Sequence, residues 1–453
     1  MRTERDTLGE VQVPDDALYG AQTQRAVENY PISGLRAHPV FTRSFIHLKR
    51  AAALANRELG AMDDATCNAI VGACDKLLGD FENYKKHFVV DVFQAGAGTS
   101  FNMNVNEVIA NLAGPGVHPN DHVNMSQSTN DVFPTAIRIA TLLLLDHLFP
   151  QLDALANALD EKGDEFKDVI KSGRTHLQDA VPVTLGQEFS AYGAATRRAT
   201  DLLRDAASEL RLLGIGGTAT GTGINTPVGY RYAVVRYLNE IVAVESTPDL
   251  REAMQSQLPV VAVSAALRSL ALELTRVTND LRLLASGPHT GLAEIILPAV
   301  QPGSSIMPGK VNPSMLECMN QVLFHIIGAA TAIDYASQAG QLELNVMMPL
   351  MAFEITFSIE ILKNYLPVFI EKCIRGIEAD YERCRDYYIN SPSLATALNP
   401  LIGYARAAEI AKESAKIGTP IPQLLREKKL LSEEEIARIF TPEFLAGQAD
   451  RKA

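Results

Sequence analysis

The sequence has no tryptophan and few cysteines. The five cysteines are an odd number, and no two of them have Cys-x-x-Cys spacing. A disulfide framework, a zinc site and an iron–sulfur cluster are therefore not expected. A basic stripe is also missing, and the net charge is −12. This charge argues against a protein that binds nucleic acid.

Targeting signals and long apolar runs are scarce as well. The N-terminus, Met1–Asp6, is charged and lacks the apolar core of a signal peptide. The most apolar run, Ile139–Leu145, is bounded by Arg138 and Asp146, so it is far shorter than a membrane span. We therefore expect a soluble, cytoplasmic protein.

Helix breakers become rare after Pro134, so long helices are expected there. The helix-compatible segments are about 135–167, 184–213, 229–243, 250–286, 313–340 and 350–375. In the fourth segment apolar residues alternate spacings of four and three, which is a heptad seam. Its members are Val263, Leu267, Leu270, Leu274, Val277, Leu281 and Leu284. The seam predicts a long helix bundle, with more apolar surface than one antiparallel packing would bury, so we expect self-association.

The chain of 453 residues is too long for one compact core, so two or three domains, or one very elongated helical domain, are expected. We predict three. Residues 1–134 are the predicted N-terminal domain, with helical patterns at 41–59, 65–81 and 102–112. Residues 135–390 are the predicted central bundle. Residues 391–453 contain shorter helices with charged faces and are predicted to form a small C-terminal domain.

One stretch, Gly303-Ser304-Ser305-Ile306-Met307-Pro308-Gly309-Lys310-Val311-Asn312-Pro313, predicts a mobile loop that leads into a helix. Asn312 suits the N-cap and Pro313 suits the first helical position. The loop would bring two hydroxyl groups, one ammonium group and a helix N-terminus to one place. Such a set suits an anion. The alternative is an ordinary surface loop before a capped helix.

Two further stretches place hydroxyl and amide groups before helices. In Gln94–Ser100, glycines allow the backbone to approach a ligand, and Thr99 offers a hydroxyl and an N–H. An ordinary turn is the alternative there. In Ser126–Asp131, the residues Ser128, Thr129 and Asn130 would hold a carboxylate without a fixed charge. A capping box at the start of a helix is the alternative.

The stretch Ser172–Pro182 is the only one that places a histidine, His176, among groups suited to bind an anion. A histidine with a structural role is the alternative.

Two other patterns resemble binding motifs, but we predict no binding site from them. His118 and His122 have metal-ligand spacing, but Pro119 argues against a helix there. Residues 214–219 fit a loose dinucleotide fingerprint but follow a helix rather than a strand. No metal and no cofactor is predicted.

The string GSSIMPGKVNP at residues 303–313 is similar to the signature loop of the aspartase/fumarase superfamily. Residues 94–108, 126–131, 173–180 (GRTHLQDA) and 221–226 resemble other conserved stretches of that family, and the resemblance extends from Leu8 to the C-terminal region. It implies an all-α, three-domain fold whose long central bundle assembles into a homotetramer. It also implies active sites that are each formed by three subunits.

The resemblance implies roles for individual residues. Ser304 would be the base, and Glu317 would orient His176. Lys310 and Asn312 would clamp one carboxylate of a dicarboxylate substrate. The remaining predicted substrate-binding residues are Thr99, Ser128, Thr129, Asn130, Thr175, Ser305 and Asn225. Because the net charge would repel an anion, we also expect local positive groups, namely Lys310 and Arg174, to dominate inside the site.

The resemblance leaves the substrate open between two reactions. Ala97, Thr129 and the run 345–347 favour deamination of L-aspartate to fumarate and ammonia, which is our leading hypothesis. Val105 and the run 132–134 favour the alternative, a class II fumarate hydratase. A silent helical scaffold would have lost its site residues, and here they are intact. His289 and Met348 depart from the family's usual arginine and glutamate.

Overall fold

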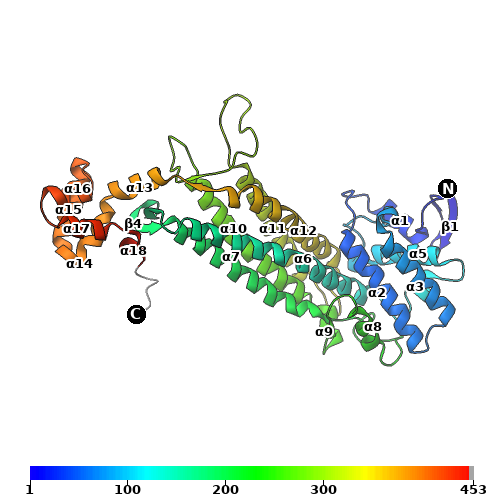
Figure 1. The fold of residues 1–453 in the computed structure, drawn as a ribbon. Helices are drawn as coiled ribbons and strands as arrows, with labels where there is room; N and C mark the ends of the chain where they lie inside the picture. The colour runs from blue at the N-terminus through cyan, green and yellow to red at the C-terminus, as the bar shows by residue number, and fades with distance from the viewer. Residues whose placement is uncertain (448–453) are drawn as a thin grey trace. The chain divides into compact units, whose positions relative to one another are not determined.

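The computed structural model describes residues 1–447, and residues 448–453 of the predicted C-terminal domain lie outside the described residues. The described chain is mostly helical (Figure 1), as predicted, with four small two-stranded sheets. The strands are β1 (Arg2–Asp6) with β2 (Gly9–Val13), β3 (Ile170–Thr175) with β4 (Gln178–Thr184), β5 (Leu212–Leu213) with β6 (Glu245–Ser246), and β7 (Ile295–Ile296) with β8 (Glu378–Ala379). Only the β5–β6 pair is parallel among the paired strands of residues 1–447.

The α-helices fall into three stretches of the chain. The first is α1 (Ala21–Asn29), α2 (Pro39–Glu58), α3 (Asp64–Gly79), α4 (Phe81–Tyr84) and α5 (Thr99–Ala113). The second is α6 (Thr129–Glu165), α7 (Leu185–Ser208), α8 (Tyr230–Leu238), α9 (Leu250–Gln255), α10 (Leu258–Leu284), α11 (Ser314–Gln338) and α12 (Met348–Lys372). The third is α13 (Tyr381–Asn390), α14 (Asn399–Ile402), α15 (Tyr404–Ile417), α16 (Ile421–Glu427), α17 (Glu433–Ile439) and α18 (Pro442–Leu445).

The predicted helical segments are confirmed, with two differences. Helix α6 starts at Thr129 and runs through Pro134, which was expected to precede it. Proline there removes only one helical hydrogen bond, while Val132 and Phe133 bury their side chains completely or almost so. The predicted segment 250–286 is two helices, α9 and α10, which are interrupted at Ser256 and Gln257.

The chain forms two compact units. The first consists of residues 1–150, 201–271 and 322–363, and the second of residues 151–200, 272–321 and 364–453. Helices α6, α7, α10, α11 and α12 each contribute residues to both units. The division into three domains at residues 134 and 390 stays a prediction.

In the first unit, four phenylalanines from three helices form an aromatic cluster. Phe41 and Phe45 of α2 pack against Phe101 of α5 and Phe133 of α6, with ring centroids 5.1–5.6 Å apart. All four side chains are buried. Edge-to-face ring contacts of this kind add to the burial of apolar area, so they fix α5 and the start of α6 against α2.

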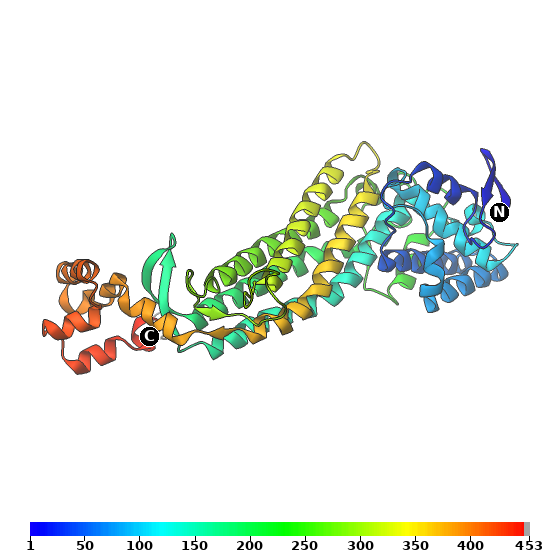
Figure 2. The ribbon, with the colours of Figure 1, turned by 90° about the horizontal axis from the view of Figure 1, so that it is seen from above.

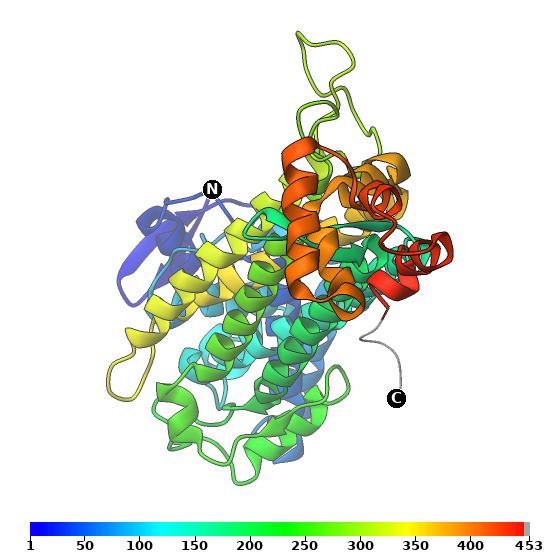
Figure 3. The same ribbon diagram turned by 90° about the vertical axis from the view of Figure 1, so that its left-hand side faces the viewer.

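In the second unit, four helices meet around a small apolar cavity lined by Leu155, Leu159, Leu274, Val277, Thr278, Met319, Phe369 and Ile374. The hairpin β3–β4 lies beside α13 and the 3₁₀ segment Pro392–Leu398 (Figure 2). The helices that follow residue 390 lie together (Figure 3, orange and red). The hydrophobic cluster among them includes Leu394, Leu398 and Leu425, together with Ile170 of β3 and Tyr388 of α13.

The heptad seam of α10 is confirmed, since all seven of its residues are at most 6% exposed. The short apolar run Ile139–Leu145 lies within a much longer apolar helix, α6. Helices α6, α10 and α11 are long and apolar enough to cross a membrane by length and composition. In the apolar stretch of each helix, the share that is buried inside the chain is 78% for α6, 39% for α10 and 44% for α11.

Candidate active site

The predicted site residues lie in both units. The first unit contains Thr99, Ser128, Thr129, Asn130 and Asn225, and the second contains Thr175, His176, Ser304, Ser305, Lys310, Asn312 and Glu317. Most of them lie on turns or at helix N-termini rather than in the middle of helices. Each group is described within its own unit.

Thr99 is exposed at the first position of α5, where backbone N–H groups lack helical partners. Gly98 precedes it with a left-handed φ of 83°. A Cβ on Gly98 would lie 2.0 Å from the Phe133 ring, so no other residue fits there. The glycines of this stretch therefore let the start of α5 pack against the aromatic cluster.

Lys49 of α2 is fully buried beneath the 124–130 stretch. Its ammonium group donates to Asn102 Oδ1 (2.8 Å), Asn124 Oδ1 (3.0 Å) and Gln127 Oε1 (2.9 Å). Asn102 in turn donates from Nδ2 to Thr129 Oγ1 at 2.9 Å. The hydroxyl proton of Thr129 therefore remains available to a ligand. Burial lowers the pKa of Lys49 to about 7.

Asp131 is also fully buried and joins two of the predicted stretches. Its carboxylate accepts from the backbone N–H groups of Ser128 (2.9 Å), Gly216 (3.0 Å) and Thr218 (3.0 Å). Burial raises its pKa to about 6, although the three N–H donors favour the ionised form. Asp131 therefore ties the start of α6 to the glycine-rich segment that leads to Asn225, an exposed residue with φ of 68°.

The capping box, which was the alternative interpretation of Ser126–Asp131, is also present in the structure. Ser128 Oγ accepts from the N–H of Asn130 (3.2 Å), and the Asp131 carboxylate accepts from the N–H of Ser128. Capping uses the Asp131 side chain and leaves the Thr129 hydroxyl proton free. The capping role therefore does not compete with ligand binding by this stretch.

Thr175 and His176 lie at the exposed tip of the β3–β4 hairpin. Thr175 pairs with Gln178, so the turn consists of His176 and Leu177, with φ of 56° and 58°. Two left-handed residues in a two-residue turn are typical of type I′, which requires unusual backbone angles for side chains of this size. The tip therefore presents His176 outward at some cost in backbone energy.

Arg174 does not supply free positive charge as we expected. Its guanidinium group makes two parallel bonds to Glu294, of 3.0 and 2.9 Å. Glu294 is fully buried, so the pair is neutral and directed inward. Of the two positive groups that we expected to dominate the site, Lys310 alone is exposed.

The loop between β7 and α11, which extends from the helix ends in Figure 1, is closed at its base. Gly303 donates its N–H to Lys310 O (2.9 Å), and Asn312 Nδ2 donates to Gly303 O (2.5 Å). A Cβ on Gly303 would lie 2.2 Å from Lys310 O, so glycine is required. The predicted N-cap at Asn312 was wrong by one residue, because α11 begins at Ser314 and Asn312 binds the loop instead.

Ser304 lies inside this loop with its Oγ directed at backbone donors. The N–H groups of Ile306 (3.2 Å) and Met307 (3.0 Å) both donate to it. Two donors on one oxygen stabilise negative charge there, which is what a serine base needs. Ser305 and Lys310 are exposed on the same loop.

Within the described residues, no hydrogen bond or ion pair joins His176 to Glu317, so one chain does not show their predicted pairing.

No group of three potential metal ligands occurs in residues 1–447. The segment Pro119–Val123 is a short π-helix, contrary to our expectation of no helix. Its two histidines accept backbone N–H bonds at Nδ1. Residues 214–219 do follow a strand, β5, but no helix begins before Tyr230, so a dinucleotide fold is absent there.

Sequence reasoning missed Lys49, Asn102 and Asp131. The run of α2 between Phe45 and Ala55 contains His47 and Arg50 as well as Lys49, so residue type alone did not single out Lys49. A charge on the buried face of a helix requires partners, but the partners lie 53 to 82 residues away and no local spacing identifies them.

Comparison with known proteins identifies the family. A family described as Lyase matches residues 9–328, and one described as Fumarase C C-terminus matches residues 394–447. The chain belongs to this lyase family.

Several relatives of this lyase are similar over nearly their full length. Aspartate ammonia-lyase of Pseudomonas aeruginosa is 48% identical over 98% of this chain and 96% of the relative. The enzyme of the same name from Helicobacter pylori J99 is 46% identical, with 98% and 97% covered. Among solved structures, a fumarate lyase:delta crystallin from Brucella melitensis matches with a TM-score of 0.93 and 46% identity over 97% of this chain and 98% of the other. A class II fumarase from Schistosoma mansoni matches with a TM-score of 0.91 but 34% identity, with 99% of each chain covered.

Burial of Lys49 predicts a pH-dependent stability. Between pH 7 and the ordinary lysine value of 10.5, the unfolded chain binds one more proton than the folded chain. The free energy of unfolding attributable to Lys49 therefore rises with pH, by up to about 1.4 kcal/mol per pH unit. Urea denaturation at pH 7, 8 and 9 should show wild type gaining stability relative to Lys49→Met. The exposed Lys76→Met serves as control and should follow wild type. A constant difference between wild type and Lys49→Met would contradict the prediction.

Proposed function

We propose that this lyase is an aspartate ammonia-lyase, which converts L-aspartate reversibly to fumarate and ammonia. The observation that carries the proposal is the near-full-length identity of 45–48% to enzymes of that name. The intact loop, in which two N–H groups meet the Ser304 oxygen, supports the same chemistry.

In the proposed reaction, the Ser304 alkoxide removes a proton from the carbon next to one substrate carboxylate. The electron pair of the broken C–H bond moves into that carboxylate, which becomes an aci-carboxylate with an additional negative charge. When the pair returns to form the C=C bond, the C–N bond breaks and ammonia leaves with its electron pair. The enzyme must therefore stabilise both an alkoxide and a doubly charged carboxylate.

The donors for these charges lie on the predicted stretches. The N–H groups of Ile306 and Met307 stabilise the Ser304 alkoxide. We assign the aci-carboxylate to the hydroxyl and N–H groups of Thr99, Ser128, Thr129 and Ser305, with Asn130, Thr175 and Asn225 as further contacts. Lys310 and Asn312 hold the other carboxylate, and His176, oriented by Glu317, lies next to it. Closure of the loop over the substrate would exclude water and strengthen all of these contacts.

We also propose that the protein is a soluble, cytoplasmic homotetramer with active sites that are each formed by three subunits. The support is the incomplete burial of α10 and α11 in one chain, since apolar faces of this size require cover. Their exposed side chains include Leu272 (53%), Phe324 (55%) and Tyr335 (67%). Shared sites would also bring Glu317 of one subunit to His176 of another.

The alternative is a class II fumarate hydratase, which uses the same base and carboxylate contacts with water as the added group. The structural similarity to a class II fumarase keeps this reading open, but at lower identity than the ammonia-lyases. The departures at His289 and Met348 favour neither reaction. Met348 is fully buried at the start of α12, so in one chain it cannot contact a ligand directly.

The proposed function predicts that purified protein forms fumarate from L-aspartate. The ultraviolet absorbance of fumarate should rise after addition of L-aspartate, with release of one ammonia per fumarate. L-malate is the control and should give no signal. Fumarate from malate alone would establish the hydratase, and silence with both substrates would require a different succinyl compound.

Replacement of Ser304 by alanine should lower the rate with L-aspartate by several orders of magnitude, because no other group in the loop would accept the proton. Folding should be nearly normal, since the side chain bonds only to two N–H groups within its own loop. Steady-state kinetics and circular dichroism check this. Ser314→Ala, at the first residue of α11 and without an assigned role, is the control and should keep activity near that of wild type. Turnover like that of wild type in Ser304→Ala would remove the assignment.

Assembly predicts a particle of four times the chain mass of 49.2 kDa in size-exclusion chromatography with light scattering. The protein should remain in the supernatant without detergent, because the partner subunits cover the apolar faces of α10 and α11. A monomer, or a protein that stays in solution only with detergent, would contradict the proposed assembly.

A further inference from the structure

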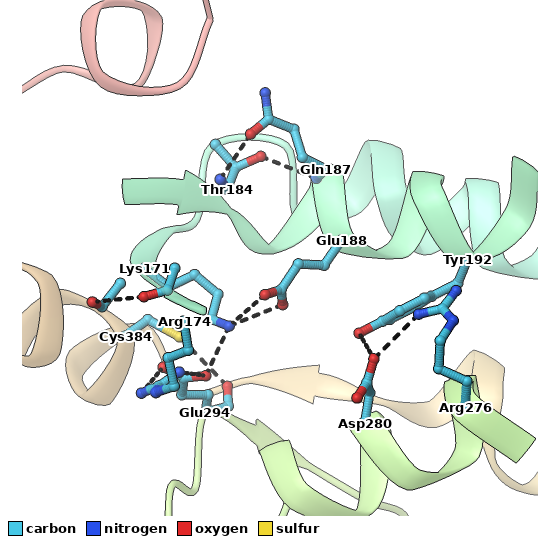
Figure 4. A network of polar contacts seen from close by, with 12 residues as sticks. Lys171, Arg174, Thr184, Gln187, Glu188, Tyr192, Arg276, Asp280, Glu294 and Cys384 are labelled. Carbon is cyan, nitrogen blue, oxygen red and sulfur yellow. Dashed lines mark hydrogen bonds and ion pairs between the residues drawn. The ribbon is translucent and has the colours of Figure 1, made fainter. Parts of the chain in front are cut away.

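A cluster of four buried or half-buried charges holds the β3–β4 hairpin (Figure 4). Lys171 of β3 bonds to both oxygens of Glu188 in α7 (2.7 and 2.9 Å) and lies 3.0 Å from Glu294. Glu294 also receives the two bonds from Arg174. Two cations and two carboxylates make the cluster neutral, and Lys171 and Glu294 are at most 1% exposed.

Glu294 is itself rigidly placed. Its N–H donates to Leu284 O at the end of α10 (2.9 Å), and its carbonyl oxygen accepts from Asp380 N at the start of α13 (3.0 Å). Cys384 Sγ lies 3.6 Å from the same oxygen. The carboxylate is therefore fixed by backbone bonds to two helices, and it serves as an anchor rather than a mobile partner.

A β-bulge directs Arg174 toward this anchor. The register between β3 and β4 shifts between Ser172 and Arg174, at Gly173. A Cβ on Gly173 would lie 2.5 Å from Val181 O, so the bulge depends on glycine. Bulges of this kind re-aim the side chain that follows. Here the guanidinium group turns inward to Glu294 and lies over the Tyr387 ring at 5.3 Å.

Arg174 is the last anchored residue before the exposed tip. Thr175, His176, Leu177 and Gln178 are all exposed, whereas the Arg174 side chain is 15% exposed. The fork of two parallel bonds fixes both the position and the orientation of the guanidinium plane. The direction in which β3 leaves the cluster, and therefore the direction of His176, depends on that fork.

We propose that Arg174 and Glu294 are positioning residues that orient the hairpin tip carrying Thr175 and His176. The proposal rests on the proposed role of these two residues at the active site. Arg174 acts through His176 and makes no contact with substrate. Its charge is already matched by Glu294, so its contribution is geometric and is not reproduced by another cation of the same charge.

The test compares Arg174→Lys with Arg276→Lys in the full-length protein. Lysine keeps the charge but cannot make the fork. Arg276 is a matched control, because it also pairs with carboxylates (Glu273 and Asp280) and lies over a tyrosine ring, Tyr192, at 5.5 Å. Figure 4 shows Arg174 with Glu294, and Arg276 with Asp280 and Tyr192. We expect kcat with L-aspartate to fall at least tenfold in Arg174→Lys and less than twofold in Arg276→Lys, with both proteins folded and assembled like wild type.

Two measurements separate positioning from a general structural effect. In a His176→Asn background, Arg174→Lys should cause no further loss of kcat, because both changes remove the same contribution. In protein labelled with ¹³C-histidine, the His176 signal, identified by its loss in His176→Asn, should move in Arg174→Lys and stay in place in Arg276→Lys. The labelled signal needs no substrate, so it tests the orientation of His176 even if L-aspartate is not turned over.

Losses that multiply in the double variant, or a His176 signal unchanged in Arg174→Lys, would overturn the proposal. If Arg174→Lys does not fold, Tyr387→Leu replaces it. This change removes the ring beneath the guanidinium group, together with the Tyr387 hydrogen bond to Gly291 O and the ring contact with Arg383. Tyr387→Leu should then shift the His176 signal and lower kcat by a smaller factor. An unchanged His176 signal in Tyr387→Leu would also overturn the proposal.

Discussion

A buried charge must find partners, because desolvation of an unpaired charge costs several kcal/mol. In this protein that requirement fixes the segments that carry the candidate site. Lys49 donates to three amide oxygens, and Asp131 accepts from three backbone N–H groups. Glu294 pairs with Lys171 and Arg174. Several residues assigned to chemistry, among them Ser128, Thr129 and His176, lie on these segments, which are therefore held in place by charges that do not react. The 303–313 loop is closed instead by bonds between Gly303, Lys310 and Asn312.

The long helices impose a second constraint, which is the cover of their apolar faces. A seam that repeats every seven residues packs against a neighbour along its whole length, and the α10 seam is fully covered within the chain. The remaining faces of α10 and α11 are not covered. The proposed assembly, with active sites formed by several subunits, would meet both needs, because it would cover these helices and bring together loops from different chains.

The sequence was informative where a local pattern determines the structure. Helix positions followed from the rarity of breakers, the α10 seam from its spacing, and the site stretches from strings such as residues 303–313. It was uninformative where the determinant is a contact between distant residues. Arg174 and Glu294 are 120 positions apart, and neither residue type nor spacing indicates that they pair. The same limit explains why the buried amides around Lys49 were missed and why Arg174 was expected to supply positive charge inside the site.

The pairing of Arg174 changes the electrostatic argument for an anionic substrate. The chain carries a net charge of −12, and of the two cations expected in the site, only Lys310 remains exposed. One lysine cannot balance a dicarboxylate that gains a further charge during reaction. In the proposed site, the remaining stabilisation would come from dipoles, namely the N–H groups at the start of α5 and hydroxyl donors such as that of Thr129. Fixed dipoles stabilise the charge of the intermediate, but they bind the substrate and product dianions less tightly than further cations would. Substrate and product can therefore both be released, which suits a reaction that runs in both directions.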